Sequence, residues 1–190
     1  RMTYFEVLVA LAYTAFADAP VDVAIVEVGM GGSWDATNVV EADVAVITPV
    51  GIDHQHFLGD TIEEIATEKA GIIHPDAIVV SAPQEEEVLT ILRDRSDEVG
   101  ARLLVEGLDF GVLTREVAVG GQMISMRGIA GDHPDLLLNL HGEHQASNAA
   151  LAVAAVEAFL GGGEQPLGGA AGQARAVGDE LGEGAHPGGP

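Results

Sequence analysis

Glu27, His54 and Lys69 are the side chains best suited to bind a metal ion and a phosphate group, and all three lie within residues 21–73. A carboxylate at the end of a strand is a common Mg²⁺ ligand, and His54 adds a neutral imidazole. Lys69 is the only lysine of the chain. It could pair with a carboxylate, contact a phosphate or, as a neutral amine, capture CO₂. The alternative is that Lys69 pairs with Glu27, Glu68 or another acid and that the histidines cap loops.

Two apolar runs, Val23–Val28 and Val44–Val50, are expected to position these groups. They are rich in Val and Ile and bounded by Gly, Pro and Asp, which is typical of strands buried on both faces of a parallel sheet. Ligands of such sheets bind at the loops that follow the strands. Thr61–Lys69 is expected to be a short helix, with acidic residues in its first turn that suit the helix dipole.

Two other kinds of site are disfavoured by spacing. The Gly29–Gly32 segment is not GxGxxG, and no acidic residue follows on a second strand, so a dinucleotide site is not indicated. His54 and His56 could belong to a metal-dependent hydrolase, but no second cluster of metal ligands has a matching spacing. The hydrolase stays open as an alternative.

The rest of the chain predicts an α/β fold. Thr3–Ala17 is expected to be a helix with a Thr3–Glu6 capping box. Residues 77–105 read as strand, helix, strand, which favours a largely parallel sheet flanked by helices. Residues 108–140 alternate around a Gly120-Gly121 turn and are expected to add an antiparallel edge. A last helix is expected from Ala146 to Leu160, and His144 and Gln145 before it could form an N-terminal cap network.

Composition sets limits on partners and location. The net charge of −22 argues against nucleic-acid binding, which needs a basic surface. No apolar run is long enough to span a membrane, no signal peptide is visible and cysteine is absent, so a cytoplasmic protein is expected. Residues 1–160 are expected to form one partial domain. Residues 161–190 hold 11 of the 25 glycines and few large apolar residues, so a disordered tail is expected there.

Three separated motifs resemble one family in the right order: EVGMGGSWDATN, GIDHQHFLGDTIEEIATEKAGII and HGEHQASNAAL. Together they resemble folylpolyglutamate synthase/dihydrofolate synthase, of the Mur-ligase-like superfamily. The resemblance runs from about Thr3 to Leu160 and implies a central ATPase domain. One departure is Ser33, which stands where the family usually carries arginine, so a cationic contact is missing from that loop.

The resemblance implies roles for particular residues. Glu27 and His54 would bind Mg²⁺, Lys69 would be carbamylated, and Asn148 would contact ATP near its base. The residues expected to line the site of the pteroate or folate are Thr3, Tyr4, Phe5, Glu6, Trp34, Asp35 and Ala36. From the residues alone, Asp35 and Asn38 could equally serve turn chemistry, and Tyr4 and Phe5 could belong to a capped helix with a buried aromatic ring.

The implied activity is ATP- and Mg²⁺-dependent addition of L-glutamate to dihydropteroate or folates, by a protein that is monomeric at full length. The chain contains no GxxxxGK[ST] loop, which such ligases use to hold phosphates. We therefore expect the isolated chain, lacking also the family's C-terminal domain, to be inactive. A catalytically dead binding domain is the alternative.

Overall fold

The computed structural model describes residues 2–19, 21–51 and 58–161, and the chain divides into two compact units. The described part of the first unit ends at residue 24. Its helix α1 (Tyr4–Asp18) begins at the predicted capping box, where the Glu6 amide donates to Thr3 Oγ1 at 3.2 Å and the Thr3 amide donates to Glu6 Oε2 at 2.6 Å. No residue of α1 is buried, and Tyr4 is 80% exposed, so the expected buried aromatic ring was wrong.

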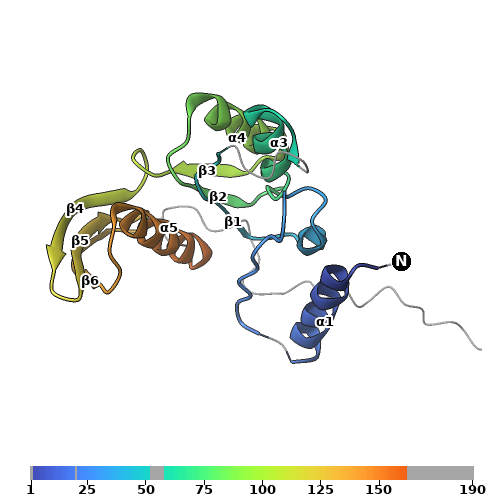
Figure 1. Cartoon of the computed structure of the whole chain (residues 1–190), viewed down its shortest axis with the longest axis horizontal. Helices are drawn as coiled ribbons and strands as arrows, with labels where there is room; N and C mark the ends of the chain where they lie inside the picture. The colour runs from blue at the N-terminus through green and yellow to red at the C-terminus, as the bar shows by residue number, and fades with distance from the viewer. Residues whose placement is uncertain (1, 20, 52–57, 162–190) are drawn as a thin grey trace, which may run out of the picture. The chain divides into compact units, whose positions relative to one another are not determined.

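The second unit is built on a parallel sheet of three strands in the order β1-β2-β3. These are β1 (Val44–Ile47), β2 (Ile78–Ser81) and β3 (Arg102–Val105), and Val46 is opposite Val80, which is opposite Leu104. Helices α3 (Ile62–Ala70) and α4 (Glu86–Val99) lie on the same side of this sheet (Figure 1). Because side chains alternate along a strand, Val79 joins the core under α3 and α4, while Val80 joins a second core.

The predicted strand Val23–Val28 is wrong, because these residues form neither helix nor strand. Ile25 is 96% exposed, although its β-branched neighbours favour strand structure. A strand also needs a neighbour to accept its backbone hydrogen bonds, and β1 pairs with β2 alone among the described strands. Composition therefore predicted the local tendency but could not supply the partner.

The antiparallel strands form a separate sheet, not the predicted edge of the parallel one. Strands β4 (Gly111–Ala118), β5 (Gly121–Arg127) and β6 (Asp132–Leu138) pair in that order, and β4 and β5 join at the predicted glycine turn. A side chain at Gly121 would overlap the Leu138 carbonyl oxygen, so this turn needs glycine there.

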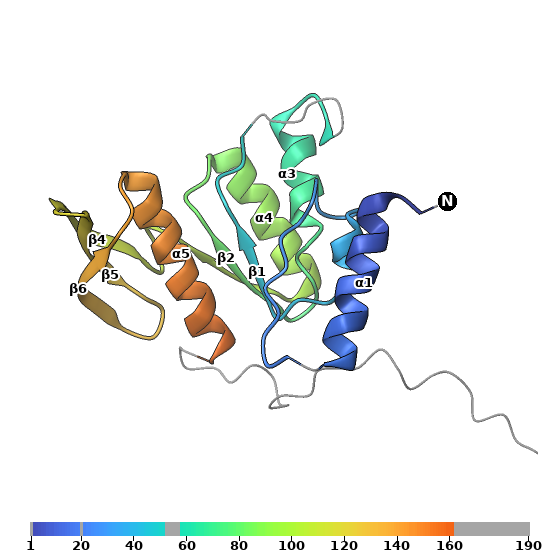
Figure 2. The same ribbon diagram turned by 60° about the horizontal axis from the view of Figure 1, so that its bottom comes forward.

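Helix α5 (Glu143–Phe159) packs against residues of both sheets. Ala150, Leu151 and Ala154 of the helix contact a core to which β2 contributes Val80 and β5 contributes Ile124 and Met126. Figure 2 shows α5 between the antiparallel strands and β1 and β2. The helix starts earlier than predicted, at Glu143, and has no side-chain cap, so the predicted cap network of His144 and Gln145 was wrong.

Candidate functional site

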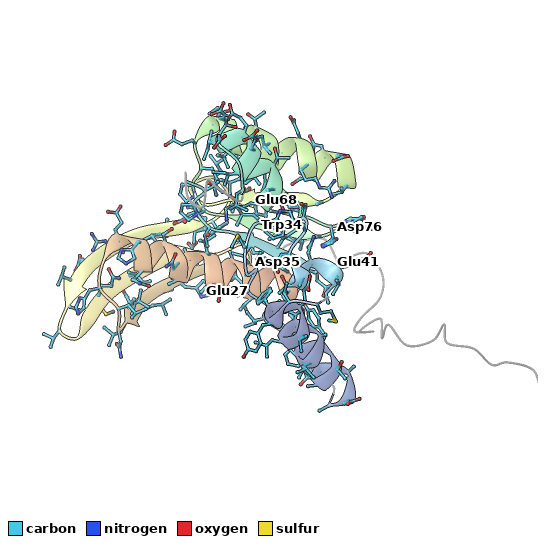
Figure 3. The ribbon with its side chains drawn as sticks, turned by 45° about the vertical axis from the view of Figure 1, so that its right-hand side comes forward. Glu27, Trp34, Asp35, Glu41, Glu68 and Asp76 are labelled. Carbon is cyan, nitrogen blue, oxygen red and sulfur yellow. The ribbon has the colours of Figure 1, made fainter. Side chains whose placement is uncertain are left out.

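The loop of residues 29–36 lies against the C-terminal end of α3. The Ser33 hydroxyl donates to the Glu68 carboxylate, at 2.7 Å from Oε1 and 2.6 Å from Oε2. The Trp34 amide donates to Glu68 Oε1 at 3.3 Å, and the Ser33 amide donates to the Glu68 carbonyl oxygen at 3.1 Å. Glu68 therefore binds two successive residues of the loop, and Figure 3 shows Glu68 next to Trp34.

Two glycines let the loop and the helix approach this closely. A Cβ on Gly32 would overlap the Glu68 carbonyl oxygen, and a Cβ on Gly71 would overlap Ser33. Any other residue at either position would push the two segments apart. The loop that carries Trp34–Ala36 and the helix that carries Lys69 therefore share a backbone-to-backbone contact.

Asp35 holds the loop in shape, as its turn interpretation predicted. It is 7% exposed, and its Oδ1 accepts from the Thr37 amide at 2.9 Å and the Thr37 hydroxyl at 2.6 Å, while Oδ2 accepts from the Met30 amide at 2.8 Å. Burial by itself would raise the pKa of Asp35. The hydrogen bonds from Thr37, Met30 and Gly29 outweigh burial and hold the pKa below its usual value. Asp35 also caps the short 3-10 helix η1 (Ala36–Val39).

Asn38 adds a second link between the loop and the end of α3. Its Nδ2 donates to the carbonyl oxygens of Ser33 at 3.3 Å and Gly71 at 3.1 Å, and its Oδ1 lies 3.0 Å from His74 Nε2. Sequence reasoning gave Asn38 only a turn role and did not single out His74. The signal was present in part, since asparagine side chains often bond to nearby backbone groups.

Lys69 is half-buried and makes no ion pair with Glu27 or Glu68, although all three residues are described. The predicted alternatives of a Glu27–Lys69 or Glu68–Lys69 pair are therefore wrong. Glu68 is engaged by Ser33 and Trp34 instead, and Glu27 is exposed. The Ser33 side chain bonds to the Glu68 carboxylate. An arginine at position 33, as is usual in the family, would therefore have Glu68 within reach as an ion-pair partner.

The predicted metal site is only partly within the described chain. His54 and His56 lie outside the described residues. Among residues 2–19, 21–51 and 58–161, no three His, Cys, Asp or Glu side chains come together as a metal site would require. Because residues 23–28 form no strand, Glu27 does not lie at a strand end. Its carboxylate is exposed and could act as an oxygen ligand.

Asn148 lies exposed in the second turn of α5, near a cleft of about 620 Å³ that it does not line. The cleft is lined by residues from the loop after β3, from the antiparallel sheet and from α5, among them Glu106, Arg115, Arg127, His144 and Ser147. Burial raises the pKa of Glu106, and a hydrogen bond of 2.6 Å from the Ser147 hydroxyl opposes this rise.

Residues 2–156 match the Mur ligase middle domain, which is four fifths of the chain. This chain belongs to that family. The dihydrofolate synthase/folylpolyglutamate synthase of Mycobacterium tuberculosis is 54% identical over 170 residues, which is 86% of this chain and 35% of the relative. The protein of the same description from Bacillus subtilis is 38% identical over 156 residues, which is 82% of this chain and 36% of the relative.

Solved structures agree with this assignment. The Mycobacterium tuberculosis folylpolyglutamate synthase complexed with ADP has a TM-score of 0.81 at 53% identity, over 87% of this chain and 38% of that one. A folylpolyglutamate synthase complex with AMPPCP and folate has a TM-score of 0.82 at 36% identity, over 87% of this chain and 40% of that one. The α/β fold is therefore confirmed, and the chain spans little more than a third of the relatives' length. Within the described residues, no helix has the length and apolar character needed to cross a membrane.

Proposed function

We propose that the protein carrying this chain is an ATP- and Mg²⁺-dependent ligase that joins L-glutamate to dihydropteroate or to folates. The observation that supports this most strongly is 54% identity over 170 residues with a dihydrofolate synthase/folylpolyglutamate synthase. Structures similar to this chain hold ADP in one case and AMPPCP with folate in another. The proposal transfers those ligands to this chain.

The proposed reaction has two steps. A carboxylate oxygen of the pteroate or folate attacks the γ-phosphorus of ATP, and the bond to ADP breaks, which leaves an acyl phosphate. The amine of glutamate then attacks the acyl carbon, inorganic phosphate leaves and the nitrogen loses a proton. The protein contributes mainly by holding the reactants in line and by balancing their negative charge.

Glu27, His54 and Lys69 are proposed to form the metal site. Bound Mg²⁺ would neutralise phosphate charge in a protein whose own net charge is −22. The exposed carboxylate of Glu27 is the kind of oxygen donor that Mg²⁺ prefers. Lys69 is proposed to be carbamylated, as the family resemblance implies, which would turn a cation into another oxygen ligand.

The family resemblance supports the proposal that Trp34 contacts the pteroate or folate and, as a separate proposal, that residues at the start of α1 do so. Trp34 is 55% exposed and offers an aromatic face for stacking, and Thr3, Tyr4, Phe5 and Glu6 are exposed at the start of α1. Asp35 would act through the loop, because its carboxylate is already bonded to Thr37 and Met30. Ala36 would add backbone contact, and Asn148 is proposed to contact the nucleotide from α5.

We also propose that the full-length protein acts as a monomer in the cytoplasm, as its resemblance to the bacterial folate ligases implies. Gel filtration of the full-length protein at micromolar concentration tests the first point. An apparent mass of twice that of one full-length chain would overturn the monomer proposal. Fractionation of cells that express the protein tests the second.

The decisive assay measures ADP release by the full-length protein with dihydropteroate, glutamate and Mg²⁺, each omitted in turn. We expect ADP only in the complete mixture, and none from the 190-residue chain alone. Lys69→Ala should lower kcat by about 100-fold or more, since charge-stabilising groups at such sites contribute on that scale. Absence of ADP from the full-length protein would favour a binding domain without activity. Metal-dependent hydrolysis without ATP, lost in His54→Ala and His56→Ala, would favour the hydrolase.

A further inference from the structure

We propose that Glu68 is a positioning residue that fixes the loop around Trp34 relative to Lys69. This inference rests on the proposed function, in which Trp34 contacts the pteroate and Lys69 belongs to the metal site. The three residues Ser33, Asn38 and Glu68 are called the Glu68 clamp below. In the Glu68 clamp, Glu68, which precedes Lys69 in the sequence, bonds to Ser33, which precedes Trp34.

The Glu68 carboxylate is bonded to both the side chain and the backbone of the loop. Both carboxylate oxygens accept from the Ser33 hydroxyl, at 2.7 and 2.6 Å, and one of them also accepts from the Trp34 amide at 3.3 Å. Hydrogen bonds to a charged acceptor are stronger than bonds between neutral groups. Glu68 therefore restrains both the side chain at position 33 and the backbone at position 34.

The loop and the C-terminal end of α3 are in close backbone contact, which leaves no room for the loop to shift. Gly32 and Gly71 have no room for a Cβ, because the loop and the helix end touch there through backbone atoms. Asn38 Nδ2 adds a second link, because it donates to the carbonyl oxygens of Ser33 at 3.3 Å and Gly71 at 3.1 Å. A shift of the loop would thus break several bonds at once, so the clamp transmits the position of α3 to Trp34.

The Glu68 carboxylate forms no ion pair or hydrogen bond with the other described side chains around it. It makes no ion pair with Lys69, and it lines a groove next to Thr67, Asp94 and Arg95 without bonding to their side chains. Arg95 bonds instead to Glu98, at 2.8 Å. Among the described residues, the side-chain hydrogen bonds of Glu68 all go to the loop, as expected of a positioning residue.

The first test uses Trp34, the only tryptophan of the chain, in the 190-residue protein. Glu68→Ala removes the acceptor of the Trp34 amide, so we expect exchange of that amide to speed up about tenfold or more and the Trp34 emission to shift. Glu68→Gln should rescue both signals, since its oxygen can accept from Trp34 and its amide can donate to the Ser33 hydroxyl. Ser33→Ala should give an intermediate result.

The matched control is Glu98→Gln, which changes a carboxylate in the same groove that does not touch the loop. It should leave both Trp34 signals unchanged. The clamp is refuted if Glu68→Ala, folded by circular dichroism, gives the same Trp34 exchange as Glu98→Gln. If Glu68→Ala does not fold, the comparison of Ser33→Ala with Glu98→Gln decides in the same way.

The second test is kinetic and uses the full-length protein. Glu68→Ala should raise KM for the pteroate about tenfold while kcat changes less than about threefold, because a displaced Trp34 weakens substrate binding more than it changes the chemical step. Ser33→Ala in the Glu68→Ala background should add no further loss, since the two groups act through one contact. A tenfold fall in kcat with no change in KM would overturn the positioning role. Failure of the wild-type protein to release ADP would refute the proposed function, while the Trp34 signals would still decide the clamp.

Discussion

Asp35 is a residue whose two carboxylate oxygens are both used. Oδ1 accepts from Thr37 and Oδ2 accepts from the Met30 amide, so an asparagine there must point its NH₂ group at an N–H donor. We expect Asp35→Asn to lower the free energy of unfolding at pH 7 by about 1–3 kcal/mol. Denaturant unfolding monitored by Trp34 fluorescence measures this.

The pH dependence of that effect has a definite sign. The pKa of Asp35 is lowered in the folded protein, so its stabilisation is complete above the usual value of 3.8 and is lost as pH falls through the folded pKa. The cost of Asp35→Asn should therefore shrink below about pH 3.8. The exposed Asp97→Asn serves as a control and should cost little at either pH. A cost that stays constant with pH would contradict the hydrogen-bonded carboxylate.

The pKa of Glu106 is shifted in the opposite direction from that of Asp35. Burial raises its pKa, so the folded state favours the neutral acid, and its contribution to stability is present below 4.5 and lost as pH rises through the folded pKa. Glu106→Gln keeps a hydrogen-bond partner for the Ser147 hydroxyl and removes the buried charge. The melting temperature should rise relative to wild type at pH 7 and be nearly unchanged at pH 4. A larger gain at pH 4 than at pH 7 would refute this.

At the scale of the element, capping boxes begin two of the described helices, α1 and α3, in different settings. Thr61 and Glu64 cap α3, whose Ile65 and Ala66 are fully buried, whereas Thr3 and Glu6 cap α1, none of whose residues is buried. Thr61→Ala should lower the free energy of unfolding of the unit built on the parallel sheet by about 1 kcal/mol. Thr3→Ala, the matched control, should reduce helicity by circular dichroism but leave that unfolding transition in place. Equal effects of the two variants would mean that α1 unfolds together with that unit.

At the scale of the whole molecule, apolar residues without partners predict association. The run from Val21 to Val26 is exposed, and strand β1 has a neighbour on one side only among the described strands. Open edges and exposed apolar patches favour contact between copies. We expect the 190-residue chain to associate as its concentration rises, and Ile25→Lys to lower the apparent mass by light scattering.

The control for that experiment is Val119→Lys, which changes a fully exposed valine next to the glycine turn between β4 and β5. It should leave association as in the wild type. If both lysine variants reduce association equally, added charge is the cause, and the apolar run is not the contact.

Sequence alone determined most of the local structure. The parallel order of strands and helices from Val44 to Val105, the glycine turn, the capping box at Thr3 and the helix start at Thr61 follow from periodicity, β-branched composition and cap chemistry, which act over a few residues. The family followed from three separated motifs, which the match of residues 2–156 to the Mur ligase middle domain confirms.

Tertiary structure decided what depends on partners distant in sequence. Val23–Val28 has the composition of a strand but pairs with none of the described strands. The antiparallel strands pair among themselves as a separate sheet, and α5 buries Ile124 and Met126 of that sheet in one core with Val80 of the parallel sheet. Sequence could assign Glu68 only as a partner of the adjacent Lys69. Folding brings it to Ser33, 35 residues away, because Gly32 and Gly71 allow the two backbones to touch. Short-range chemistry thus sets the elements, and long-range packing selects which of their polar groups meet.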